Sequence, residues 1–178
     1  MNIHPFFVHF PIALLTVYSL LELGSYFFLS VRRQAWVFPV KAFLLFVGVL
    51  AALVALATGG IAEDLIEGTT RSYILEVHSS VAGVTTLLYV ILAATYLVRI
   101  FDVKGWGARI ASMNRLFAWS WNIKRRFWNF FLNSWLMPFV ALLALIGIII
   151  TGALGAAIVY GPDIDPAVSF IYHLFLVQ

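Results

Sequence analysis

Long apolar stretches, separated by short clusters of charge, glycine and proline, dominate the chain from end to end. A helix that crosses a bilayer needs about 20 apolar residues. Four stretches meet this requirement, at approximately residues 6–29, 38–62, 73–100 and 135–160. The pattern predicts an all-α integral membrane protein, an antiparallel four-transmembrane-helix bundle that forms a single domain over residues 1–178.

The composition supports an integral membrane protein and excludes several kinds of cofactor site and cross-link. Hydrophobic residues make up 63% of the 178 residues and charged residues 11%, with a mean hydropathy of +1.00. A soluble domain is about half apolar and about a quarter charged. The chain has no cysteine, which excludes structural disulfides, thiolate haem ligands and cysteine-ligated iron–sulfur clusters. Because the first stretch lacks a basic start, we expect a mature helix there and not a cleaved signal peptide.

Basic residues are divided very unevenly between the two sides of the predicted helices. Of the eleven Lys and Arg residues, all but Arg71 fall between the first and second helices or around the connection between the third and fourth. The positive-inside rule makes that side cytoplasmic. We therefore expect a multi-pass protein of the cell inner or plasma membrane with both termini on the outer, periplasmic or extracellular, side.

The two segments outside the predicted spans have their own patterns. Residues 102–133 mix basic residues with tryptophan and phenylalanine, which predicts an amphipathic helix in the cytoplasmic interface between the third and fourth spans. This helix either seats the protein in the membrane or docks a partner subunit. Nucleic acid is not expected as a partner, since the aromatic residues suit lipid better. The tail, residues 162–178, is too short to span and is expected to be an outer interfacial or re-entrant helix carrying His173.

Two histidines occupy matching places in the predicted helices. A short repeat, Thr58-Gly59 near the end of the second span and Thr151-Gly152 near the end of the fourth, relates the two halves of the chain. It makes the first and third helices equivalent, with His9 and His78 in their outer turns. Two imidazoles at one depth on opposed helices suit bis-histidine ligation of a b-type haem.

Other residues would complete such a haem site. Gly59 and Gly152 would leave room for the porphyrin between helices, and Arg71 could pair with a propionate. His4 could cap the first helix, bond a propionate, or ligate a second haem together with His173. The expected cofactor is one haem b, with a second only in that last case.

Several alternatives stay open at this point. A histidine at a membrane boundary can be an interfacial residue bonded to backbone or lipid, and His9 with His78 could bind Zn or Cu as the metal. A divalent-metal site could also use the outer carboxylates, which are Glu63, Asp64, Glu67 and Glu76.

Glu22 is a second anomaly, because it is a carboxylate within an apolar span. Tyr26, Lys41 and Arg99 belong to the same cytoplasmic half and are possible partners. Buried carboxylates in membranes either pair internally or mark proton and substrate paths. Both alternatives are compatible with the sequence.

Four segments together resemble a known family. They are the opening HPFFVHFPIALL, the ATGGIAED that ends the second span, His78 at the start of the third, and the closing GALGAAIVYG. They are similar to the predicted membrane proteins of domain-of-unknown-function family 2231, whose histidine motif is carried here by His4 and His9. The resemblance implies a four-helix membrane module without assigned chemistry.

The leading functional hypothesis is a haem-b-binding membrane subunit of a respiratory-type electron-transfer complex, with the haem near the outer face. It implies an outer redox protein in a larger membrane complex, and the quinone pool or another haem as electron partner. A cofactor-free structural or assembly subunit and a divalent-metal-binding membrane protein are the alternatives. No catalytic motif is present, so an enzyme acting alone is not expected.

Overall fold

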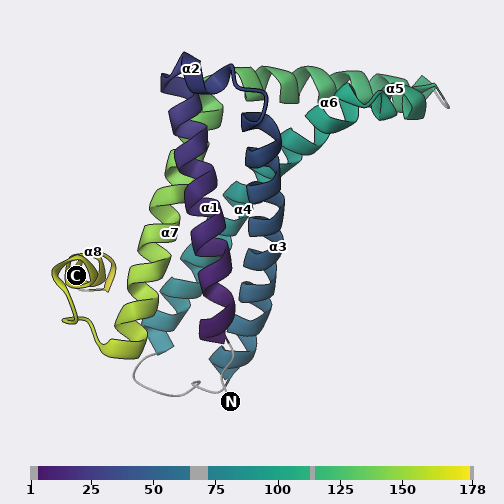
Figure 1. Ribbon diagram of the computed structural model, residues 1–178. Helices are drawn as coiled ribbons and strands as arrows, with labels where there is room; N and C mark the ends of the chain where they lie inside the picture. Colours follow the sequence, from purple (N-terminus) through teal and green to yellow (C-terminus); the bar gives the residue numbers. More distant parts are fainter. Residues whose placement is uncertain (1–3, 65–71, 113–114, 177–178) are drawn as a thin grey trace.

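The computed structural model describes residues 4–64, 72–112 and 115–176, and every regular element in this part of the chain is an α-helix (Figure 1). The helices are α1 (His4–Phe27), α2 (Leu29–Arg32), α3 (Val37–Asp64), α4 (Ser72–Val103), α5 (Trp106–Ala111), α6 (Arg115–Asn133), α7 (Leu136–Tyr160) and α8 (Pro166–Leu176). Among them, α1, α3, α4 and α7 are long and apolar enough to cross a membrane. The prediction of an all-helical protein with four spans is confirmed.

Local backbone signals set the ends of these helices. The first helix stops at Phe27, earlier than its apolar stretch, because Phe28 adopts an extended backbone before the short α2. Gly105 has φ +69° and separates α4 from α5 within the segment expected to be one helix. Gly161 has φ +96° at the end of α7, a conformation that glycine adopts at little cost, and Pro162 follows it. The Asp165 carboxylate caps α8 by accepting hydrogen bonds from the first backbone N–H groups of that helix.

The four long helices form a closed ring of neighbours. Helix α1 packs against α3 and α7, and α4 packs against the same two helices, so that α1 and α4 occupy opposite corners. Figure 1 shows the chain passing up through α1, down through α3, up through the tilted α4 and down through α7. We call these four helices the helical core.

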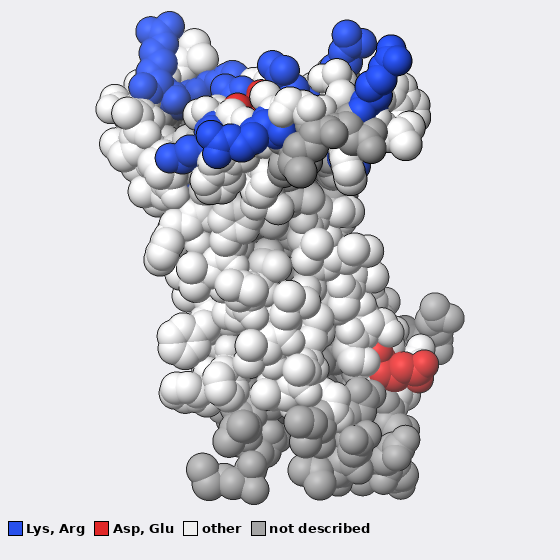
Figure 2. Space-filling view, turned by 90° about the vertical axis from the view of Figure 1, so that its right-hand side faces the viewer, with Lys and Arg blue, Asp and Glu red and all other residues white. Residues whose placement is uncertain are grey.

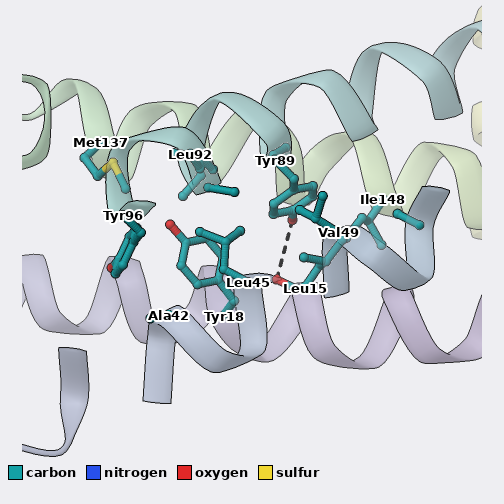
Figure 3. Packing of buried hydrophobic residues seen from close by; sticks show 14 residues of the cluster. Leu15, Tyr18, Ala42, Leu45, Val49, Tyr89, Leu92, Tyr96, Met137 and Ile148 are labelled. Atoms are coloured by element: carbon teal, nitrogen blue, oxygen red, sulfur yellow. Dashed lines mark hydrogen bonds between the residues drawn. The ribbon is translucent and has the colours of Figure 1, made fainter. Parts of the chain in front are cut away.

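The centre of the helical core is packed with large side chains. Tyr18 from α1 and Tyr89 and Tyr96 from α4 are almost fully buried and point toward one another across the ring (Figure 3). Glycines bring neighbouring helices close, as is common in membrane proteins. A Cβ atom on Gly48 of α3 would lie 2.5 Å from Leu15 Cδ2 of α1, and one on Gly147 of α7 would overlap the hydroxyl of Thr85 in α4.

The two ends of the helical core differ in charge. All ten described Lys and Arg side chains gather at the end formed by α2, α5, α6 and the adjoining turns of the core, which we call the basic end (Figure 2). At the opposite end α8 lies across α7, and Val168 packs against Ala157 and Ile74. Because α1 and α4 begin at this end and carry His9 and His78 in their first two turns, we call it the histidine end.

Candidate functional site

His9 and His78 lie at similar depth at the histidine end. Helix α1 begins at His4 and α4 at Ser72, which puts both histidines about 8 Å from their helix starts at 1.5 Å per residue. His9 is exposed, whereas His78 is half-buried. The two helices that carry them are at opposite corners of the helical core.

A glycine of α7 makes space for the His78 ring. A Cβ atom on Gly155 would lie 3.2 Å from Cε1 and 3.8 Å from Nδ1 of His78. The first of these distances is tighter than ordinary van der Waals contact. The imidazole therefore occupies the space that the missing side chain of Gly155 leaves between α4 and α7.

The other residues expected around a cofactor are more scattered. Gly152 is exposed, with nothing within 4 Å of an added Cβ, so it lies on the outside of the helical core and not between helices. Gly59 is half-buried near the end of α3. The His4 side chain and Arg71 lie outside the described part of the chain, as do the side chains of Glu63, Asp64 and Glu67.

The structure does not gather a multidentate metal site from the residues it describes. Within that part of the chain no three His, Asp or Glu side chains come together in a way that could hold a metal ion. His173 is exposed on α8, and its Nδ1 lies 2.8 Å from the backbone oxygen of Ser169 in the same helix. This contact lies within α8 and does not involve His9 or His78.

The second anomaly of the sequence, Glu22, is the centre of a buried polar cluster. Lys41 Nζ lies 3.1 Å from Glu22 Oε2, and the side chains are only 11% and 8% exposed. The Tyr96 hydroxyl donates a hydrogen bond of 2.7 Å to the same oxygen, and Lys41 also donates one of 2.9 Å to Ser25 Oγ. We call Glu22, Ser25, Lys41 and Tyr96 the Glu22 cluster. Of the three partners considered from the sequence, Lys41 is the one that pairs with the carboxylate.

Tyr96 was not expected in this cluster. It reaches Glu22 from the opposite corner of the helical core, and Tyr89, two turns earlier on α4, shares a hydrogen bond of 2.8 Å with Ser19 of α1. Tyr18 lies between them, edge-on to both tyrosine rings (Figure 3). These bonds tie the two diagonal helices together through the centre of the protein.

The chemistry of the Glu22 cluster is that of a compensated ion pair. A buried charge in a membrane is costly unless an opposite charge and hydrogen bonds satisfy it. Glu22 has both, from Lys41 and Tyr96, and Lys41 has a further acceptor in Ser25. The geometry thus favours internal pairing over an open proton path for this carboxylate.

The match to known proteins covers nearly the whole chain. A family model described as "Predicted membrane protein (DUF2231)" matches residues 1–163, which covers all four spanning helices. No curated protein and no solved structure matches the chain. As a membrane protein it contacts the lipid bilayer through its spanning helices. The chain belongs to the predicted membrane protein family DUF2231.

Proposed function

We propose that this protein is a membrane subunit of an electron-transfer assembly that holds one b-type haem at the histidine end, with His78 and His9 as the ligands. The observation that carries the proposal is the half-buried His78 imidazole in the space left by Gly155, at the depth of His9 on α1. Haem iron accepts neutral imidazole nitrogen and supplies one-electron chemistry when bound.

The surroundings of His78 favour a functional role for the ring. Polar side chains within membrane spans are costly and usually functional. A larger residue in place of Gly155 would fill the space between α4 and α7 with apolar atoms, yet the chain keeps a glycine there.

The proposed topology places the haem near the outer face. The gathering of basic side chains at one end supports an antiparallel bundle with the basic end in the cytoplasm and both termini outside. In this arrangement α6 lies in the cytoplasmic interface. A shallow haem cannot by itself carry an electron across a core of about 30 Å. We therefore include an outer redox protein, and quinone or a second haem in a partner subunit, in the proposal.

A cofactor-free assembly subunit is the second candidate, and one observation favours it. Helix α6 has no buried residue and exposes Trp119, Phe127 and Phe130 beside its basic side chains. Such a surface suits a partner subunit as well as lipid. This candidate predicts that an α6 variant loses co-purifying protein while no cofactor is present in any preparation.

The visible spectrum of the purified protein separates these proposals. Protein from haem-replete cells should show a reduced-minus-oxidised spectrum with b-type α and Soret bands and about one haem per chain. A preparation that is folded but lacks these bands would refute the haem proposal. Elemental analysis of the same sample tests Zn and Cu, which would indicate a different occupant of the two histidines.

A further inference from the structure

A pocket opens at the basic end and reaches down to the Glu22 cluster. It has a volume of about 230 Å³ and is lined by residues of α1, α2, α3, α4, α6 and α7. Glu22, Lys41 and Tyr96 are buried and form its inner part, whereas Arg32 and Arg99 are exposed and lie at its rim. We call this cavity the basic-end pocket. It is much larger than the space that a single water molecule needs.

The charges of the basic-end pocket do not balance. Its inner carboxylate, Glu22, is already matched by Lys41 at 3.1 Å. Arg32 makes no ion pair with any side chain of the described chain, and Arg99 is 3.8 Å from Asp102, which Arg125 holds more closely at 2.9 Å. Arg32 therefore has no carboxylate partner among the described side chains, and Arg99 shares Asp102 with Arg125, so positive charge remains at the rim to attract an anion. Guanidinium matches the geometry of phosphate oxygens particularly well.

The surroundings of the basic-end pocket indicate where that anion comes from. Tyr26, Phe38 and Leu132 make part of the pocket lining apolar. The neighbouring connection between α1 and α3 exposes Phe28 and Trp36. Exposed aromatic residues beside basic ones are typical of the headgroup layer of a bilayer. Basic pockets between membrane helices bind the headgroups of anionic lipids.

We propose that the basic-end pocket binds a phosphate group, supplied in the membrane by the headgroup of an anionic phospholipid. Arg32 and Arg99 contact the phosphate oxygens, and the apolar part of the lining accommodates the start of an acyl chain. A free phosphate ion offers the same oxygens to the two arginines. This inference concerns the end of the protein opposite the histidines and does not depend on haem.

Lipid titration of matched variants tests the proposal. The full-length protein is delipidated in a neutral detergent and titrated with short-chain phosphatidylglycerol, phosphatidylcholine or inorganic phosphate, and binding is followed by native mass spectrometry. The test variant is Arg32→Gln/Arg99→Gln. The control is Arg33→Gln/Arg109→Gln, which removes the same charge at the same end but changes no residue that lines the basic-end pocket.

The expected result is that wild type and control bind one phosphatidylglycerol in preference to phosphatidylcholine. The Arg32/Arg99 variant should bind it about ten-fold or more weakly, as the loss of two cations near the headgroup implies. Binding of inorganic phosphate with the same dependence on Arg32 and Arg99 supports the phosphate site with the free ion as its source. Equal losses in test and control variants, or no preference for phosphatidylglycerol over phosphatidylcholine together with no phosphate binding, would overturn the proposal.

Discussion

The two ends of the helical core accommodate their buried and half-buried polar side chains in different ways. At the basic end, Glu22 is bonded to Lys41 and Tyr96, partners from two other helices. At the histidine end, about 20 Å away along α1 at 1.5 Å per residue, the half-buried His78 lies in the space left by a glycine. In the first arrangement, the charged groups of Glu22 and Lys41 are paired with each other and with neighbouring hydroxyl groups of the protein. The second places an imidazole ring in a space between α4 and α7.

This difference assigns different roles to the two regions. A compensated ion pair that joins three helices favours one arrangement of the packing, because separating the pair would leave a buried charge without its partner. A histidine within a membrane span is costly to keep and usually has a function. We infer that the Glu22 cluster is chiefly structural and that the histidines are functional. Variants of these residues and of nearby glycines test this division of roles.

Breaking the buried ion pair should have the largest effect. Lys41→Met leaves the Glu22 charge buried without its cation and is expected to lower the free energy of unfolding by about 3 to 5 kcal/mol. The double variant Glu22→Leu/Lys41→Met removes both charges and should regain most of this loss. Unfolding in mixed detergent micelles measures both values. A double variant as unstable as the single one would contradict the pairing.

The two tyrosine bonds across the centre should differ in strength. Tyr96→Phe removes a hydrogen bond to a charged carboxylate and should cost about 2 kcal/mol of unfolding free energy. Tyr89→Phe removes a bond to the neutral Ser19 hydroxyl and should cost about 1 kcal/mol or less. Comparing the two in one unfolding assay tests whether Glu22 is ionised in the folded protein. Equal costs would argue against a charged acceptor.

Two glycine substitutions on α7 distinguish a glycine in close contact with α4 from a glycine on the exposed surface. Gly147→Ala forces Thr85 to move and is expected to cost roughly 1 to 2 kcal/mol. Gly152→Ala adds a methyl group where there is no neighbour, and should leave stability unchanged or raise it by less than about 1 kcal/mol. Thermal unfolding midpoints provide the measurement. A destabilised Gly152→Ala would mean that this face is covered by something that the single chain lacks.

The smallest effect on stability is expected at the histidine end. In Gly155→Ala the new methyl group lies 3.2 Å from His78 Cε1, so the ring must move by a few tenths of an ångström. The unfolding free energy should stay within about 1 kcal/mol of wild type, because alanine also favours the helix. The α band of a haem on His78 should shift or weaken. An unchanged spectrum in a haem-bearing sample would show that His78 is not a ligand.

The sequence predicts the helices well because the bilayer imposes a length requirement that hydropathy alone reveals. The predicted ends of the four spans lie within three residues of the observed ones; the first helix ends before Phe28, and the third span extends to Val103. Phe28 is apolar like its neighbours, so no compositional signal marks its extended backbone. The connection after α4 divides into α5 and α6 because Gly105 takes a positive φ, which helical propensity within the segment does not reveal.

The candidate sites were predicted less completely. Lys41 was one of three possible partners of Glu22, with Tyr26 and Arg99, because all three come from the same half of the spans. Tyr96 was missed because tyrosine is ordinary in an apolar span. A signal was available: Tyr18, Glu22 and Ser25 recur at helical spacing on α1, and Tyr89 and Tyr96 stand two turns apart on α4. Polar residues in register on two apolar helices can indicate bonds between them.

The outward position of Gly152 could not be predicted from its neighbours. Both Gly152 and Gly155 are small residues near the end of the last span, and only the rotation of α7 about its axis decides which one faces α4. Three residues rotate a helix by about 300°, or 60° short of a full turn. This rotation depends on packing against α1 and α4, which leaves little trace in a uniformly apolar sequence.

The most direct test of the account compares His78→Ala with His173→Ala in one preparation series, measuring haem content and unfolding free energy together. We predict that His78→Ala loses the b-type Soret and α bands while its apoprotein is destabilised by only about 1 to 2 kcal/mol, much less than Lys41→Met. His173→Ala should keep both bands. A His78→Ala variant that retains full haem content, or one that destabilises the apoprotein as strongly as Lys41→Met, would contradict the division between a functional histidine end and a structural Glu22 cluster.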